Sequence, residues 1–229
     1  MRKLSILLPH SRGTRHGGSG APWSPGASSL PALDEFRAQV VSAADLGDAP
    51  TKRSIERFDG VLYRELDYPT LSDTARRRAR SSVLVFNGLM GASAPGDPMP
   101  DHRLGLGDRQ DPLGRLATWW KPRLTPVLAD HLKGADVWDL LPGEHSAAWD
   151  PTAVNTNRRI TVRFVNVEGA TVSHWNKLLK GALVRHIVDH RLVDPEGLAD
   201  FDHPAGYRLD AAASVLDGPQ PRVILRADY

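Results

Sequence analysis

Residues 71–86 read LSDTARRRARSSVLVF, and this stretch indicates the class of fold. Leu71, Ser72 and Asp73 are typical of a helix start, and residues 74–81 continue it as an arginine-rich helix. Residues 83–86 are then entirely apolar, which is typical of a buried strand. A helix that leads directly into a buried strand is characteristic of proteins that interleave the two kinds of element.

The same alternation continues on both sides of this stretch. Apolar runs predict further strands, and apolar residues at helical spacing predict further helices. The expected strands cover 4–8, 137–141, 159–167, 206–209 and 223–226, and the expected helices cover 33–44, 55–58, 116–132 and 175–192. Residues 45–52 are expected to be a linker, and the proline-rich residues 94–100 are expected to be irregular. We therefore predict an α/β (mixed α+β) fold, with a central mixed sheet and surrounding helices in a single domain over 1–229.

Composition excludes several classes of protein. The 229 residues include no cysteine, which rules out disulfides, thiolate catalysis and cysteine-ligated zinc. No run approaches the roughly 20 apolar residues of a membrane span, and the apolar stretch at 4–8 is too short for a signal peptide. We expect a cytoplasmic protein, a monomer, with no membrane contact and no cofactor.

The charge pattern leaves nucleic-acid binding open. The formal net charge is +2, and the isoelectric point near 9.0 permits contact with DNA without requiring it. Arginines are concentrated on the helix at 74–81. This cluster is either a solvated helix face or a patch that contacts phosphates of duplex DNA. Its members are Arg76, Arg77, Arg78 and Arg80.

The strongest candidate site is the segment at residues 173–181, SHWNKLLKG. His174 can serve as a general base near neutral pH, and Asn176 can bind a ligand beside it. Lys177 and Lys180 are three residues apart and share one helix face, where they can hold an anion. The positive end of the helix dipole is expected to lower the proton affinity of Lys177. The alternative is an ordinary helix start with two solvated lysines.

Three further groups follow strand ends or turns. Glu144 and His145 lie just after the strand expected at 137–141, where α/β proteins usually place ligands. His102 and Arg103 suit a planar anion or a surface ion pair. Ser11 belongs to a glycine-rich loop at 10–20 that either approaches a ligand closely or lies on the surface. We expect these groups to share one pocket with His174 and Lys177. His186 and His190, four apart on a helix, lack an assignable third ligand, so no metal site is predicted.

Several segments in this order resemble the YaaA family of bacterial peroxide-stress proteins. The resemblance covers nearly the whole chain, and no single motif carries it alone. The matching segments are 61–68, 88–91, 95–100, 102–104, 138–140 with Glu144 and Ala147, 172–177, 180–181, 191–192, Phe201 and 206–207.

The resemblance implies the α/β fold of that family and a cytoplasmic protein linked to peroxide resistance and to limiting free iron. It also implies DNA binding through an element like a helix-hairpin-helix, for which residues 87–91 are the nearest match. Several positions depart from the family pattern around the expected cleft. Arg12 and Thr14 replace an acidic residue and a lysine, Met90 an aromatic residue, Ala94 an arginine, and His102 and His145 tyrosines.

Two functions therefore remain open. The first is a DNA-binding stress protein that limits iron-dependent oxidative damage. The second is an enzyme that uses the same scaffold to act on a small planar or anionic metabolite. In the second, Lys177, His174, Glu144 and His145 would be catalytic. The ligand would be held by Ser11, His102, Arg103, Asn176 and Lys180.

Overall fold

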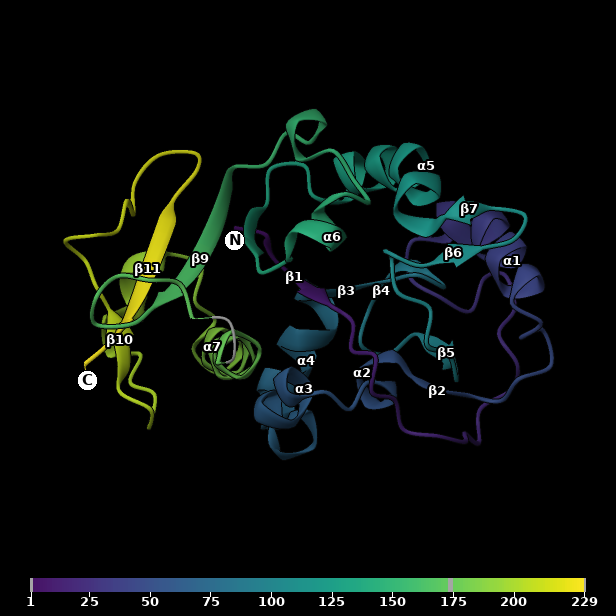
Figure 1. Cartoon of the computed structure of the whole chain (residues 1–229), viewed down its shortest axis with the longest axis horizontal. Coiled ribbons are helices and arrows are strands. Elements are labelled where there is room, and N and C mark those ends of the chain that lie inside the picture. The colour runs from purple at the N-terminus through teal and green to yellow at the C-terminus, as the bar shows by residue number, and fades with distance from the viewer. Residues whose placement is uncertain (1, 173–174, 229) are drawn as a thin grey trace.

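The computed structural model describes residues 2–172 and 175–228 and has a seven-stranded mixed sheet at its centre (Figure 1). The strand order is β10-β11-β9-β8-β1-β3-β4. Five adjacent strands run parallel, and an antiparallel strand lies at each edge. The parallel strands are β1 (Leu4–Pro9), β3 (Val83–Asn87), β8 (Asp136–Asp139), β9 (Arg158–Val165) and β11 (Arg222–Ala227), and the edge strands are β4 (Gly91–Ser93) and β10 (Tyr207–Leu209).

Helices pack on this sheet and against one another. Helices α3 and α4 lie beside α7 in Figure 1, whereas α1 and α5 lie at the far end of the molecule. The helices are α1 (Asp34–Ala43), α2 (Ser54–Arg57), α3 (Val61–Leu66), α4 (Asp73–Ser82), α5 (Leu116–His131), α6 (Gly143–Ser146) and α7 (Asn176–His190). Short 3-10 turns cover Pro31–Leu33, Tyr68–Thr70, Pro151–Ala153 and Pro195–Asp200. The predicted α/β class is confirmed.

The central strands are apolar because both faces of the sheet are covered. All six residues of β1 and all five of β3 are buried. Parallel strands covered on both sides read as continuous apolar runs rather than as alternating patterns. The apolar stretches at 4–8 and 83–86 have this form, and they pair with each other from Ile6 and Val83 onward.

The order of the strands creates a crevice at one end of the sheet. β1 is followed along the chain by β3 on one side, and the chain later returns to place β8 on the other side of β1. All three strands are parallel, so their carboxyl ends lie at the same edge. Ligands of open α/β sheets bind at such a switch point, outside the carboxyl ends of the strands.

The glycine-rich loop after β1 is held in place by hydrogen bonds. Arg57 is fully buried and donates to the carbonyl oxygens of Arg15, Gly17 and Met99. Asp101 accepts hydrogen bonds from the hydroxyl of this loop's Thr14. The loop at 10–20 is therefore fastened to the body of the protein.

Two expectations about irregular segments are wrong. Residues 98–100 form strand β5 (Pro98–Pro100), which pairs antiparallel with β2 (Thr51–Arg53) in the expected linker. Proline is tolerated because β5 has a single partner strand, so the missing N–H groups can point away from the ladder. A further pair, β6 (Arg109–Gln110) and β7 (Gly114–Arg115), forms a small hairpin.

The segment expected to resemble a helix-hairpin-helix is instead a buried β-turn region. Residues 87–91 join β3 to the antiparallel strand β4, and Leu89 and Met90 are fully buried there. Trp120 donates a hydrogen bond to the carbonyl oxygen of Gly88. No helix flanks the hairpin on its β4 side among the described residues, so this segment has neither the helices nor the exposure of such a motif.

Candidate functional site

A cavity of about 580 Å³ lies at the carboxyl ends of β1 and β8. It is bordered by the loop after β1, the start of α3, the α6 region and the start of α7. The polar residues that line it are His10, Ser11, Arg12, Tyr63, Glu144, His145, Asn176, Lys177 and Lys180. We call this cavity the cleft. It occupies the position that the switch in strand order predicts for a ligand.

Helix α7 brings two lysines to the cleft. The Nζ of Lys180 donates a 2.7 Å hydrogen bond to the carbonyl oxygen of Leu140, just after β8. Burial is the main reason that the pKa of Lys180 falls from 10.5 to about 8; the carboxylate of Asp139 opposes this effect, and the nearby charge of Lys177 adds to it. Lys177 itself is exposed. The lysine whose proton affinity is reduced by burial is therefore Lys180, one turn later than the sequence suggested.

Two imidazoles form a hydrogen-bonded pair on the cleft wall. Nδ1 of His10 lies 2.8 Å from Nε2 of His145. Burial lowers the pKa of His10 to about 4 and that of His145 to about 3. The charge of Arg12 contributes to the lowered pKa of His10, and His10 and Lys180 contribute to the lowered pKa of His145. Both rings are therefore neutral at pH 7.

The cleft also has an anionic and a hydroxyl component. Glu144 is exposed, and its Oε1 lies 3.5 Å from Nδ1 of His145. Ser11 accepts a 3.1 Å hydrogen bond from the backbone N–H of Gly13 through its Oγ. Arg12 pairs with Asp108 at 2.8 Å, so its charge is already balanced. Among the described residues that line the cleft, Glu144 carries the carboxylate that opposes Lys177 and Lys180, so the lining has a net positive charge.

Glycine at position 60 shapes the cleft. A Cβ placed on Gly60 would lie 2.2 Å from Oγ of Ser11, closer than any real contact. The backbone at the start of α3 can therefore approach Ser11 only because no side chain is present.

Two residues expected in the cleft lie elsewhere. The side chain of His102 turns into the protein and packs edge-on against Phe58, with ring centroids 6.1 Å apart. Its Nδ1 accepts a hydrogen bond from the backbone N–H of Leu104. Burial lowers the pKa of His102 to about 3. Arg103 is exposed and does not line the cleft. His174, also expected here, lies outside the described residues.

All four arginines of α4 have partners within the protein. Arg76 pairs with Asp73, and Arg78 donates to the backbone carbonyls of Val188 and Asp189 at the end of α7. Arg80 donates to the hydroxyl of Tyr68, and Arg77 to the hydroxyl of Thr74. Arg78 thus satisfies carbonyl groups that the end of a helix leaves without partners.

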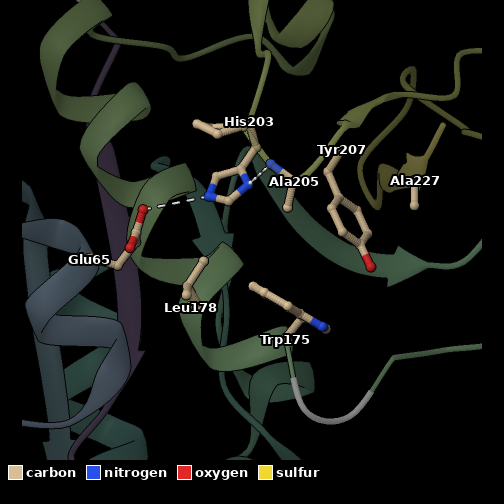
Figure 2. A pocket seen from close by; sticks show the side chains of 8 residues that line it. Glu65, Trp175, Leu178, His203, Ala205, Tyr207 and Ala227 are labelled. Carbon is tan, nitrogen blue, oxygen red and sulfur yellow. Dashed lines mark hydrogen bonds and ion pairs between the residues drawn. The ribbon is translucent and has the colours of Figure 1, made fainter. Parts of the chain in front are cut away.

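A second cavity, of about 590 Å³, lies beside α7 near the C-terminal strands (Figure 2). Its wall carries His203, whose Nδ1 accepts a hydrogen bond from the N–H of Ala205 and whose Nε2 lies 3.5 Å from Glu65. Both nitrogens of His203 therefore face groups of the protein. Neither lysine nor arginine lines this cavity, and the lining includes none of the residues that the sequence marked as a site.

Within residues 2–172 and 175–228, no group of three or more histidine, aspartate or glutamate side chains is placed to hold a metal ion. The rings of His186 and His190 lie 4.3 Å apart without a third ligand. Over the same residues, no helix combines the length and apolar character needed to cross a bilayer.

Three polar residues of the cleft were not among the site residues that the sequence predicted. His10 and Arg12 follow β1 in the same way that Glu144 and His145 follow β8, so the strand-end rule could have identified them. Tyr63 lies inside an apolar helix and carried no such signal. Its hydroxyl donates a 2.8 Å hydrogen bond to the carbonyl oxygen of Pro9, which ties α3 to the end of β1.

Comparison with known proteins gives a consistent result. A sequence model described as peroxide stress protein YaaA matches residues 29–213. A UPF0246 protein of Streptomyces coelicolor is 32% identical over 94% of this chain and 95% of its own length. A UPF0246 protein of Ruegeria pomeroyi is 31% identical over 76% of this chain and 72% of its own. A third, from Methylibium petroleiphilum, is 32% identical over 74% of this chain and 68% of its own.

Proposed function

This chain belongs to the YaaA family of peroxide stress proteins, and we propose that its cleft binds a small planar anion and supports acid–base chemistry on it. The observation that carries the proposal is the pair Lys177 and Lys180 on one wall of a 580 Å³ cavity. The start of α7 adds the positive end of a helix dipole to the same wall. Anions are therefore favoured over neutral or cationic ligands.

The apolar part of the cleft lining favours a ligand with an apolar body. Val61, Leu62 and Pro142 contribute apolar surface to the lining. A flat ring can lie against such a surface while its charged group faces the lysines, because ligand pockets combine apolar walls with a few polar groups. A planar acid satisfies both requirements, whereas a bare inorganic anion satisfies only one.

The polar residues suit proton transfer. The pKa of Lys180 near 8 places this lysine close to the range in which general acids and bases work at neutral pH. Glu144 and His145 lie on the same cleft and can exchange protons with a bound ligand. In this proposal Lys180, Glu144, His145 and His174 are catalytic, and Ser11, Asn176 and Lys177 hold the ligand, so the two lysines exchange the roles that the sequence suggested.

Chemical-shift mapping with benzoate tests the proposal. Benzoate is planar and anionic, so adding it to ¹⁵N-labelled protein should shift backbone signals of Ser11, Gly13 and Lys177. Inorganic phosphate should shift the same signals at higher concentrations only. Shifts confined to residues of the second cavity, such as Ala205 and Ala227, would contradict the proposal, as would no shifts at all.

Duplex DNA binding and the limitation of iron-dependent damage are the family-based alternative. Arg77 and Arg80 are the exposed guanidinium groups of α4 that could contact phosphates. If they do, DNA affinity should fall with salt by about 0.9 logarithmic units per logarithmic unit of salt for each contact. The variant Arg77→Ala/Arg80→Ala should then bind more weakly with a smaller salt dependence. An unchanged salt dependence would exclude this surface.

We further propose that the protein works in the cytoplasm as a monomer. The family supports the first part, since peroxide resistance in these proteins is an intracellular task. The second part is a proposal that the mass of the protein in solution tests directly. Light scattering at the concentration used for ligand binding should give a mass near 25.1 kDa. A mass of twice that value would contradict the monomer.

A further inference from the structure

The histidine pair on the cleft wall has a property that neither ring has alone. A neutral imidazole carries one N–H group, and its second nitrogen is an acceptor. The hydrogen bond between Nδ1 of His10 and Nε2 of His145 needs one donor and one acceptor. The tautomer of either ring therefore determines the tautomer of the other.

The outer nitrogens of the pair are buried and have no hydrogen-bond partner. These atoms are Nε2 of His10 and Nδ1 of His145. His145 as a whole is only 3% exposed. Buried polar atoms without partners are uncommon, and each needs an explanation such as a ligand or a catalytic use.

The carboxylate of Glu144 determines which tautomer the pair adopts. Its Oε1, 3.5 Å from Nδ1 of His145, favours a hydrogen on that nitrogen. At the other end, Oδ2 of Asp108, Nε2 of His10 and Nη2 of Arg12 lie 3.2, 3.3 and 3.4 Å from one point, the Cβ position on Gly105. Asp108 and Arg12 form an ion pair, so their opposite charges largely cancel at Nε2. The resting pair thus has N–H at Nδ1 of His145 and a free acceptor at Nε2 of His10.

We propose that His10 and His145 form a proton relay that supplies a proton to a ligand in the cleft. This inference rests on the proposed function of the cleft. The Nδ1–H bond of His145 breaks as its proton passes to a basic atom of the ligand. The shared proton moves from Nδ1 of His10 to Nε2 of His145. Nε2 of His10 takes up a proton from hydronium, which leaves water.

The surroundings of the pair suit this path. Arg12, at the His10 end, has a side chain that is 68% exposed, so solvent reaches the vicinity of Nε2. Both rings have pKa values of about 4 or lower, so no positive charge rests on the pair at pH 7. When the protons move in one concerted step, both rings stay neutral, and no charged imidazole has to be buried.

The linkage between the tautomers can be measured without any ligand. In protein labelled with ¹⁵N-histidine, nitrogen chemical shifts distinguish protonated from unprotonated ring nitrogens. We expect unprotonated Nε2 in His10 and protonated Nδ1 in His145. Glu144→Lys replaces the acceptor beside Nδ1 of His145 with a cation. This change should reverse the tautomers of both histidines. The signal of Nε2 in His10 should then move toward the protonated position.

Two controls separate relay from general electrostatics. Glu168→Lys makes the same charge change at an exposed turn outside the cleft and should leave both rings unchanged. The double variant His145→Phe/Glu144→Lys keeps an aromatic ring at position 145 but removes the nitrogen that contacts His10. The nitrogen signals of His10 should therefore be the same in this double variant as in His145→Phe alone. An unchanged His10 signal in Glu144→Lys would overturn the relay, and so would a protonated ring in the wild type at pH 7. Benzoate binding is measured separately, so either result leaves the proposed function to its own test.

Discussion

The ammonium group of Lys180 donates a 2.7 Å hydrogen bond to the backbone carbonyl of Leu140. This contact joins α7 to the chain just beyond β8, the strand whose carboxyl end borders the cleft. It also keeps the lysine in a partly desolvated position, which lowers its pKa to about 8. The charge of Lys180 is thus sensitive to pH in a range where an ordinary lysine is fully protonated.

The lowered pKa of Lys180 should make the free energy of unfolding depend on pH. Between pH 8 and pH 10.5 the unfolded chain keeps a proton on Lys180 that the folded protein has released. Stability rises with pH wherever the unfolded state binds more protons. The contribution of Lys180 to the free energy of unfolding should therefore increase over this window. Lys180→Met should lack that increase in urea titrations at pH 8 and pH 10, whereas Lys133→Met, on an exposed turn, should retain it. Equal slopes in both variants would contradict the buried position.

Acid sensitivity should arise from the buried histidines. His10, His102 and His145 have pKa values of about 4, 3 and 3, below their usual 6.5. As the pH falls below 6.5 the unfolded chain takes up protons that the folded protein cannot, so stability is lost progressively. His102→Phe should reduce the loss between pH 7 and pH 5 by up to about 2 kcal/mol.

The control for this measurement is His190→Phe, which removes an exposed histidine. It should change the difference between pH 7 and pH 5 by much less than His102→Phe does in urea unfolding. A wild-type protein equally stable at both values would show that these rings are not held neutral by burial.

Gly181 should be needed for the packing of α7 against α3. A Cβ at this position would lie 2.3 Å from the carbonyl oxygen of Leu62 and 2.8 Å from Cβ of Glu65. The backbone cannot yield as a flexible side chain would, so Gly181→Ala should destabilise the protein by about 1–3 kcal/mol despite alanine's higher helix propensity. Gly47→Ala meets no atom within 4 Å and should be nearly neutral. A thermal unfolding midpoint of Gly181→Ala equal to that of the wild type would contradict the close contact.

Local patterns in the sequence were sufficient for the main elements. Trp120, Leu124 and Leu128 recur at helical spacing, and all three are fully buried along α5. The continuous apolar run of β1 likewise indicated a strand covered on both faces. The pairing of β5 with β2 escaped prediction because it depends on a partner about 47 residues away, which proline content alone cannot reveal.

The candidate site was predictable as a location and less so in its details. Ser11, Glu144 and His145 were found because they follow strand ends, which a parallel sheet gathers at one edge. The sequence could not show that Lys180 is half-buried whereas Lys177 is exposed, since this depends on the approach of Leu140. Nor could it show that His102 turns toward Phe58, or that Arg78 meets the end of α7.

Titration calorimetry of the lysine variants with benzoate decides whether the cleft is an anion site. Lys177→Met keeps the stem of the side chain and should fold with an unchanged thermal midpoint. It should lose about tenfold to a hundredfold in affinity, because a hydrogen bond to a charged group contributes about 1.5–3 kcal/mol. Lys177→Met/Lys180→Met should abolish measurable binding, and Lys133→Met should bind as the wild type does. Equal affinity in all four proteins would contradict the account of this cleft as an anion site.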